Sequence, residues 1–219
     1  MSNKVSVPVG NDFCPQTLFT YGTFKEDGTP NFGLFCWFSY CWFDELGVMC
    51  AIGGHKQTQD RILATRVFSA NLVTESNLAL SDYFGTADGH DADKLGREPT
   101  PEEIADKMDI PFQWERGHVL DVPVLTDCPF SFELEVDKII PTNEEEGSTV
   151  FLCRIRNVLK DASLVDSGLP VDELMRKIGA VRTAGGIEYW AWDGRHLGTW
   201  HEPAQKIKPG VQVGKAAQM

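Results

Sequence analysis

The fold is decided by the stretch Asn31–Leu72, NFGLFCWFSYCWFDELGVMCAIGGHKQTQDRILATRVFSANL. It begins with two apolar runs, Asn31–Tyr40 and Leu46–Ile52, whose aromatic and β-branched residues predict β-strands. A short helical pattern follows from Thr58 to Arg66, and a further strand pattern covers Val67–Val73. Aromatic residues occupy both faces of the first strand, so we expect core, a ligand or a partner subunit to cover it on both sides.

The connection between the second strand and the helix is the candidate binding feature. Gly53 and Gly54 free the backbone there, and Lys56 and Thr58 follow at once. We expect the Thr58 hydroxyl to cap the helix by accepting a hydrogen bond from its first turn. Backbone N–H groups, a hydroxyl, a cation and the positive end of a helix are what binding of a phosphate group requires. The alternative is an ordinary loop and helix cap without a ligand.

Length, composition and charge restrict the possible functions. The chain has 219 residues, 42% of them hydrophobic, and no linker or internal repeat, which predicts one globular domain over residues 1–219. The net charge of −12 argues against nucleic acid or an anionic membrane surface as a partner. An anionic ligand must therefore rely on local cations, and Lys56, Arg61 and Arg66 lie close together in the sequence.

No apolar run approaches the roughly 20 residues that span a bilayer, and the first residues lack an apolar signal core. We therefore expect a cytoplasmic protein that does not enter a membrane. The six cysteines show neither a C-x-x-C pair nor a zinc-ligand spacing, so no metal centre is predicted. Cys36, Cys50 and Cys153 lie in apolar strand patterns, which predicts small reduced residues of the core.

The remaining sequence adds further strands. Thr17–Lys25 is strand-like and is followed by an Asp-Gly turn. Phe130–Val136 and Thr149–Val158 alternate clearly, with Phe132, Leu134, Val136, Phe151, Cys153 and Ile155 predicted to face inward and Ser131, Glu133, Glu135, Asp137, Arg154 and Arg156 outward. Opposite charges on the exposed face of this hairpin would favour its pairing.

Two regions are less regular. Residues 86–122 are rich in Gly, Pro and acidic residues, and we predict a surface excursion or a lid, with a helix over Pro101–Lys107. Near the end of the chain a helix over Val171–Ile178 and a hairpin between 187 and 200 are predicted, and the chain beyond His201 is expected to be frayed. Some seven or eight strands connected mostly as hairpins, with short helices at the corners, indicate a mainly β protein: a closed or partly closed antiparallel barrel.

The order of motifs resembles the flavin reductase-like family, which includes flavoredoxin and NAD(P)H:flavin oxidoreductases and has the FMN-binding split-barrel fold. The motifs that carry the resemblance are Asp27-Gly28-Thr29-Pro30-Asn31, Trp37-Phe38-Ser39, His55-Lys56-Gln57-Thr58 and Phe68-Ser69-Ala70-Asn71-Leu72, followed by a Leu-rich helix that ends in Gly. The similarity is strongest over residues 17–85 and looser to about residue 200. The chain departs from the family pattern at Asp44-Glu45, where the family often has Pro-Pro, and at Cys153-Arg154, where it often has Gly.

The resemblance implies a homodimer that binds FMN near the subunit interface. The residues that it implies for cofactor binding are Phe35, Cys36, Trp37, Phe38 and Ser39 along the isoalloxazine ring, His55, Lys56 and Thr58 at the phosphate, and Asn71 and Leu72 near the flavin or supporting its strand. For the aromatic residues the alternative is plain barrel core or dimer interface. For Asn71 the alternative is satisfaction of backbone groups inside the sheet.

The function implied by the resemblance is an FMN-dependent oxidoreductase that takes a hydride from NADH or NADPH onto flavin N5 and passes electrons to free flavin or another small redox partner. Such chemistry requires no nucleophile or general base from the protein, so we predict no catalytic residue. The absence of a Ser/His/Asp or Cys/His set in the sequence is consistent with this prediction. Two alternatives are an electron carrier that holds FMN without NAD(P)H activity and a binding protein that uses the same barrel without flavin.

Overall fold

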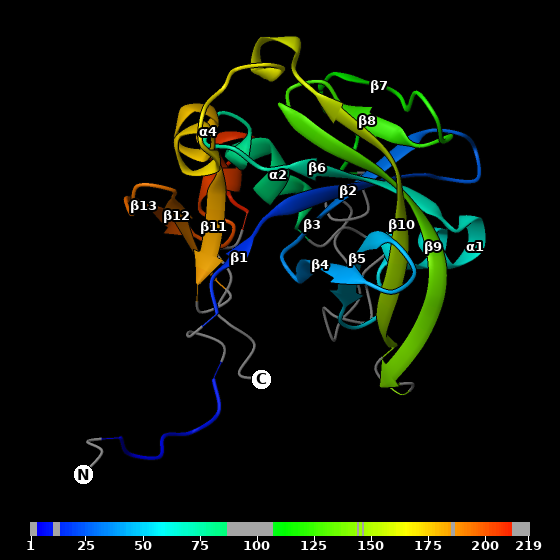
Figure 1. Ribbon diagram of the computed structural model, residues 1–219, viewed down its shortest axis with the longest axis horizontal. Coiled ribbons are helices and arrows are strands. Elements are labelled where there is room, and N and C mark those ends of the chain that lie inside the picture. The colour runs from blue at the N-terminus through cyan, green and yellow to red at the C-terminus, as the bar shows by residue number, and fades with distance from the viewer. Residues whose placement is uncertain are drawn as a thin grey trace.

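The structure is a computed structural model that describes residues 4–10, 14–86, 107–143, 145, 147–184 and 187–211 (Figure 1). Strands dominate it, as predicted. The strands are β1 (Gln16–Thr17), β2 (Phe19–Phe24), β3 (Pro30–Phe35), β4 (Phe38–Trp42), β5 (Leu46–Ile52), β6 (Val67–Leu72), β7 (Trp114–Arg116), β8 (Pro123–Leu125), β9 (Phe130–Asn143), β10 (Ser148–Lys160), β11 (Val181–Ala184), β12 (Glu188–Ala191) and β13 (His196–Thr199). The helices are α1 (Gln57–Thr65), α2 (Leu78–Phe84) and α4 (Val171–Ile178), with short 3-10 turns η2 (Ala162–Leu164) and η3 (Pro203–Lys206).

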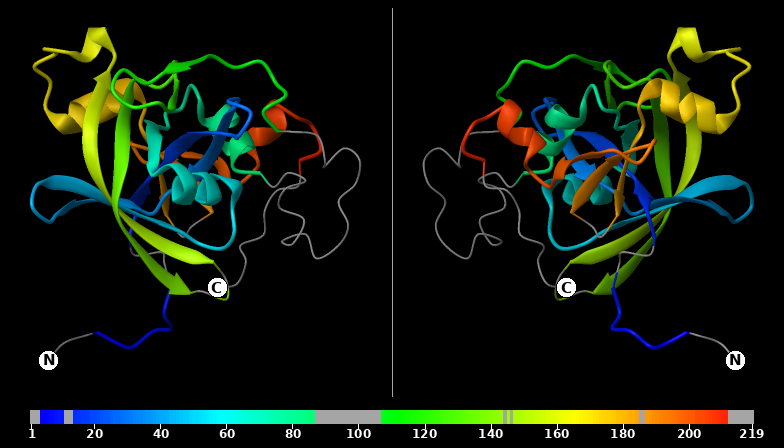
Figure 2. Two further views of the ribbon diagram at one scale, coloured as in Figure 1. Left: turned by 90° about the vertical axis from the view of Figure 1, so that its right-hand side faces the viewer. Right: turned by 90° about the vertical axis from the view of Figure 1, so that its left-hand side faces the viewer.

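The strands form a seven-stranded sheet in the order β3-β2-β6-β9-β10-β5-β4, a four-stranded sheet in the order β1-β11-β12-β13, and the pair β7-β8. All pairings within these sheets are antiparallel. The long strands β9 and β10 sweep around the body of the molecule (Figures 1 and 2). Of the helices in the described residues, none has the length and apolar character that crossing a membrane requires.

The predicted single strand over residues 31–40 is two strands. β3 ends at Phe35 and β4 begins at Phe38, and these two strands are the opposite edges of the large sheet. Cys36 and Trp37 therefore join one edge of the sheet directly to the other, and we call this pair of residues the edge link. The sheet must curl to allow so short a connection. Among the described strands no hydrogen-bonded ladder joins β3 to β4, so the predicted closure of the barrel is not seen there and the two edges are connected only by the edge link.

Aromatic rings fill the interior of the curled sheet. The Phe38 ring of β4 lies 4.2 Å from the Phe19 ring of β2 and 5.7 Å from the Phe132 ring of β9, although these strands are not neighbours in the sheet. Tyr21 stacks on Phe35 at 4.5 Å. The hairpin residues predicted to face inward are buried or packed against this core, and Cys50 and Cys153 are buried free thiols, as predicted. Burial of each large ring contributes roughly 1.5–3 kcal/mol.

A second layer covers the outer face of β2 and β3. The Phe32 ring lies 5.5 Å from Phe84 of α2 and 5.7 Å from Phe112. Arg116 lies over the Phe24 ring at 4.6 Å. The described part of the predicted excursion, residues 107–122, thus packs against the large sheet. Residues 87–106, which include most of the predicted helix over 101–107, lie outside the described residues.

The chain beyond His201 was predicted to be frayed, and this is wrong for residues 202–211, the part of that segment that the structure describes. Its anchor is Asp82 on α2, whose side chain is completely buried. The carboxylate accepts hydrogen bonds from the Tyr189 hydroxyl at 2.6 Å and from the backbone N–H groups of His201 and Ala204, both at 2.9 Å. The sequence did not indicate this because the three donors lie more than a hundred residues from Asp82 along the chain.

The predicted charge pairing on the β9–β10 hairpin is confirmed by the ion pairs Arg154–Asp137 and Arg156–Glu135. The same cluster includes Asp44 and Glu45, so it joins the two segments at which the sequence departs from the pattern of the family that it resembles. Arg154 contacts Asp137 at 2.8 Å, Asp44 at 3.0 Å and Glu45 at 2.6 Å. Its guanidinium also lies over the Phe43 ring at 5.1 Å. The two departures are therefore one feature, in which an ion-pair cluster holds the turn between β4 and β5 against β10.

Glu133 was predicted to face solvent, and instead it is completely buried. Its carboxylate accepts the backbone N–H groups of His118, Val119 and Leu120 and the side-chain amide of Asn157, at 2.6–2.9 Å. Burial alone would raise the pKa of Glu133, but these hydrogen bonds outweigh burial and hold the pKa below its usual value. Strand alternation identified the face of the sheet correctly but not the loop that covers it.

Replacement Glu133→Gln should reduce the dependence of stability on acid pH. Because the folded-state pKa is lowered, the carboxylate stabilises the fold above its ordinary pKa of about 4.3, and this contribution is lost as the pH falls through the folded-state value. The variant should unfold more easily at neutral pH and lose less stability than the wild type between about pH 6 and about pH 3. Urea unfolding across this range measures the effect, with the half-exposed Glu135→Gln as control. Parallel stability curves for wild type and Glu133→Gln would contradict this reading.

Candidate functional site

The loop between β5 and α1 has the backbone of an anion site. Gly54 has a φ of +70°, which glycine adopts without strain, and Lys56 occupies the N-cap position with extended φ and ψ. No side chain of the described residues caps the helix. The Asp60 N–H donates to the Lys56 carbonyl at 3.0 Å, so the N–H groups of residues 57–59 have no carbonyl partner within α1. The positive end of the helix is therefore open to an external anion.

Thr58 was predicted to cap this helix, and this is wrong. Its side chain is buried, and its hydroxyl accepts a hydrogen bond from the Asn31 side-chain amide at 3.0 Å. Asn31 also donates to the Thr23 hydroxyl at 3.3 Å, so the three side chains tie α1 to the β2–β3 hairpin. Thr58 therefore brings its backbone N–H to the first turn of the helix, and its hydroxyl is used inside the protein.

The three cations close in sequence are not gathered in space. Lys56 is half-buried at the N-cap of α1. Arg61 contacts Glu26 at 3.1 Å, and Arg66 is the C-cap at the opposite end of the helix. Since α1 rises about 1.5 Å per residue, Arg66 lies more than two turns away from Lys56. Lys56 is thus the one member of the three that lies at the loop.

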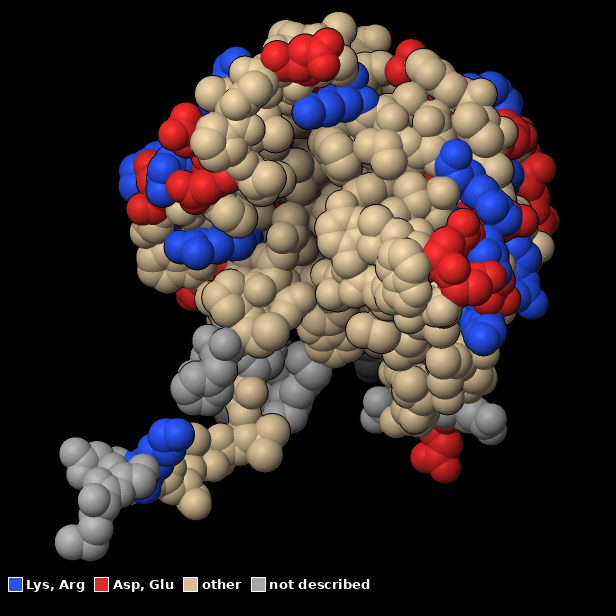
Figure 3. Space-filling model, viewed as in Figure 1, with Lys and Arg blue, Asp and Glu red and all other residues tan. Residues whose placement is uncertain are grey.

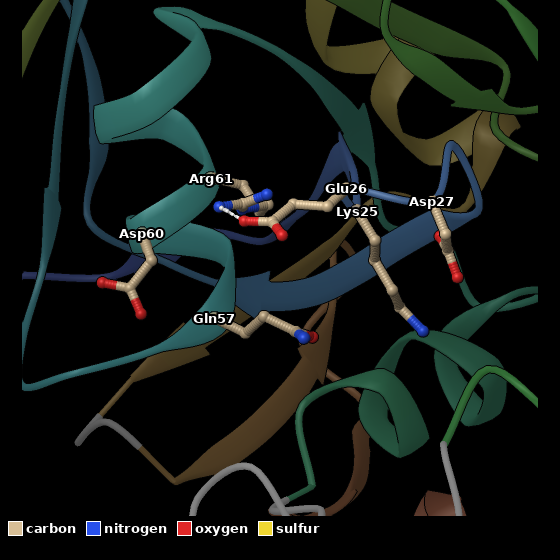
Figure 4. A pocket seen from close by; sticks show the side chains of 6 residues that line it. All are labelled: Lys25, Glu26, Asp27, Gln57, Asp60 and Arg61. Carbon is tan, nitrogen blue, oxygen red and sulfur yellow. Dashed lines mark hydrogen bonds and ion pairs between the residues drawn. The ribbon is translucent and has the colours of Figure 1, made fainter.

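A cavity of about 340 Å³ adjoins the first turns of α1 (Figure 4). It lies between this helix and the turn of the β2–β3 hairpin, and it is lined by Lys25, Glu26, Asp27, Gln57, Asp60 and Arg61. In Figure 4 the Arg61 guanidinium points to Glu26 rather than into open space. With three carboxylates against two cations, this cavity has no excess of positive charge, and we do not assign a phosphate to it.

The structure divides the five residues predicted along the flavin ring. Phe35 and Phe38 point into the core, which is the alternative that the sequence left open for the aromatic residues. Cys36 is half-buried against a second apolar cluster, and burial raises the pKa of its thiol to about 11. Trp37 is 43% exposed, and Ser39 is also exposed. Trp37 is therefore the aromatic side chain of this group that is accessible to a ligand.

The edge link and the glycine loop are neighbours. The Ala51 N–H donates to the Trp37 carbonyl at 3.0 Å. A Cβ placed on Gly53 would lie 3.6 Å from the Trp37 ring, which is ordinary van der Waals contact. The two parts of the predicted site, separated in sequence by β4 and β5, are thus brought side by side by the pairing of these strands.

Asn71 and Leu72 of β6 lie behind the site. Leu72 belongs to the main core. The buried Asn71 amide donates to the Thr20 carbonyl and the Ser69 hydroxyl, both at 2.9 Å, and accepts from the Leu125 N–H at 3.1 Å and the Ser131 hydroxyl at 2.9 Å. These four bonds use its full capacity, which favours the alternative that Asn71 satisfies groups inside the sheet.

Sequence reasoning missed the residues that hold the loop in place. The Gly54 N–H donates to the Ser148 hydroxyl at 3.2 Å, and the side-chain amide of Gln59 donates to the Thr149 hydroxyl at 3.1 Å and to the Gly147 carbonyl. The only local signal was a glycine after an acidic run, which indicates a turn and nothing about its partner.

Several solved structures share the fold of this chain. No curated protein sequence matches the chain. Similar solved structures include the 2-nitrobenzoate 2-nitroreductase NbaA of Pseudomonas fluorescens (20% identity, 85% of each chain covered, TM-score 0.66) and the flavoredoxin of Desulfovibrio vulgaris Miyazaki F (22% identity, 87% of this chain and 93% of that chain, TM-score 0.65). The FMN-binding protein of Thermus thermophilus, solved with bound p-hydroxybenzaldehyde, is also similar (20% identity, 87% of this chain and 94% of that chain, TM-score 0.61).

At these identities the structural likeness shows a common fold. The family is shown by the sequence itself, because residues 12–169, well over half of the chain, match the flavin reductase like domain. The chain therefore belongs to the flavin reductase-like family and has its split-barrel fold.

Proposed function

We propose that this protein binds FMN and acts as an NAD(P)H-dependent flavin reductase. The observation that carries the proposal is the uncapped first turn of α1, preceded by the glycine loop and flanked by the exposed Trp37. Family membership supports it, as does the likeness in fold to the FMN-binding protein of Thermus thermophilus.

The residues present fit the cofactor. The phosphate would be held by the backbone N–H groups of residues 57–59 and by the Lys56 ammonium group, a combination that suits a dianion. The ring would lie along the edge link, beside Trp37. Because β3 and β4 each pair with a single neighbour among the described strands, their outer edges offer backbone donors and acceptors to the polar side of the ring.

The chemistry that FMN supplies when bound is acceptance of a hydride at N5 from NADH or NADPH and transfer of electrons to free flavin or another small acceptor. The protein's part is to bind and orient the ring, and no side chain needs to act as a nucleophile. Cys36 belongs to the edge link and Cys41 to β4, and burial raises the pKa of both thiols and keeps them protonated.

Replacement Lys56→Ala should weaken FMN binding by about tenfold or more, the effect of losing one charge-assisted contact to a phosphate. Titration by quenching of flavin fluorescence measures the dissociation constant. Arg66→Ala is the matched control, because it removes the same charge from the opposite end of α1. If both variants bind FMN as tightly as the wild type, the phosphate site is assigned wrongly.

The likeness to flavoredoxin favours a second candidate, an FMN-holding electron carrier without NAD(P)H activity. We expect the purified protein to be yellow and its flavin to be bleached rapidly on mixing with NADH or NADPH in a stopped-flow instrument. Bleaching by dithionite but not by either nucleotide would favour the carrier. A colourless protein that takes up no added FMN would leave a binding protein that uses the barrel without flavin.

A homodimer belongs to the same proposal. The β4–β5 hairpin projects from the body (Figure 2) and carries exposed apolar side chains, Tyr40 58%, Trp42 75%, Leu46 51% and Met49 42%, next to Trp37 of the edge link at 43%. Figure 3 shows the face around β4 and β5 as largely uncharged. A patch of this kind, next to the edge link, is typical of a subunit interface.

Replacement Trp42→Glu should convert the proposed dimer to a monomer, because it places a charge at the most exposed side chain of this patch, opposite Leu46 in the strand register. Light scattering after size-exclusion chromatography measures the mass. Val165→Glu is the control, since Val165 is also an exposed apolar residue, at 52%, and lies outside this patch at the end of η2. A wild-type protein that is monomeric at micromolar concentration would overturn the interface.

A further inference from the structure

The loop that precedes α1 is fastened to a distant part of the chain, the turn of the β9–β10 hairpin. One contact is the hydrogen bond from the Gly54 N–H to the Ser148 hydroxyl at 3.2 Å. It joins residues 94 positions apart in sequence. It also fixes the glycine whose positive φ turns the chain toward the helix. The position of the loop therefore depends on the hairpin as well as on its own residues.

A second contact orders the first turn of α1. The Gln59 side chain is 3% exposed, and its amide nitrogen donates to the Thr149 hydroxyl at 3.1 Å and to the Gly147 carbonyl. Gln59 lies in the same turn whose backbone N–H groups face outward from the helix end. A side chain anchored on the hairpin thus sets the orientation of the N–H groups that are proposed to bind the phosphate.

A third contact restricts residue 147 to glycine. Gly147 has a φ of +70°, and a Cβ added there would lie 2.6–2.8 Å from three atoms of the His55 ring. Side-chain atoms do not approach so closely, so any larger residue must displace His55 or the turn. Since His55 lies between Gly54 and Lys56, such a displacement acts directly on the loop.

We infer that the turn formed by Gly147, Ser148 and Thr149 is the positioning element for phosphate recognition, and that it gives the protein its preference for FMN over unphosphorylated riboflavin. The inference rests on the proposed function. The three contacts reach the glycine loop and the start of α1, which is the phosphate half of the proposed site. Loosening the turn should therefore affect the phosphate of the ligand and not its ring.

The test compares dissociation constants for FMN and riboflavin, measured by fluorescence quenching in wild type, Gly147→Ala, Ser148→Ala and Lys56→Ala. We expect Gly147→Ala and Ser148→Ala to weaken FMN binding by about tenfold, the scale of one lost hydrogen bond to a charged group, and to leave riboflavin binding unchanged. Gly168→Ala is the matched control. Gly168 also has a positive φ, +63° against +70° for Gly147, but a Cβ added at residue 168 would meet nothing within 4 Å.

The possible failures are distinguishable. If the wild type binds FMN and riboflavin equally, the proposed phosphate site itself is wrong. If Lys56→Ala abolishes the preference while Gly147→Ala and Ser148→Ala retain it, the phosphate site stands and the positioning role of the turn is overturned. If the variants weaken the binding of FMN and of riboflavin equally, the positioning role is also overturned, since that result indicates a general structural role of the turn. Should Gly147→Ala fail to fold by circular dichroism, Ser148→Ala carries the test, because it removes only one acceptor.

Discussion

The structure depends on one constraint, the two-residue link that joins the opposite edges of a seven-stranded sheet. Cys36 and Trp37 are too few to cross a flat sheet of this width, so the sheet must curl until β3 and β4 meet. The curl encloses the aromatic core, where Phe38 packs on Phe19 and Phe132. It also turns the outer edges of β3 and β4 and the Trp37 ring toward the glycine loop. The candidate site is therefore a consequence of how the sheet curls.

Two hairpins brace this arrangement by different means. The β4–β5 hairpin is held by the contacts of Arg154 with Asp44, Glu45 and Asp137. These ion pairs act only once the hairpin has formed. The β9–β10 hairpin instead holds the loop before α1 through neutral hydrogen bonds and through the close packing of Gly147 against the His55 ring.

The parts of the fold that local patterns determine were predictable. Alternation in residues 130–136 and 149–158 identified β9 and β10, and Gly179 in the left-handed conformation ends α4 as expected. The break between β3 and β4 was not predictable, because strand-favouring residues continue through it and only the pairing partners change. Likewise, alternation placed Glu133 on the outer face, yet the loop that buries it comes from a separate segment.

The same limit applies to the site. The two glycines and the start of the helical pattern located the loop at residues 53–58, because glycine marks a position where the backbone adopts a positive φ. The use of the Thr58 hydroxyl by Asn31 and the anchoring of Gln59 on Thr149 depend on distant segments, and no local pattern reports them. Sequence reasoning located the loop that is the candidate anion site. It missed the side-chain hydrogen bonds from distant segments that hold this loop in place.

The buried Asp82 carboxylate has a consequence for the order in which the chain folds. Its three donors are supplied by Tyr189, His201 and Ala204, which lie 107, 119 and 122 residues away along the chain. A chain that has already formed α2 must therefore keep this charge in contact with water until these distant residues dock on it. Burial of Asp82 consequently cannot precede the folding of the segment that carries its donors.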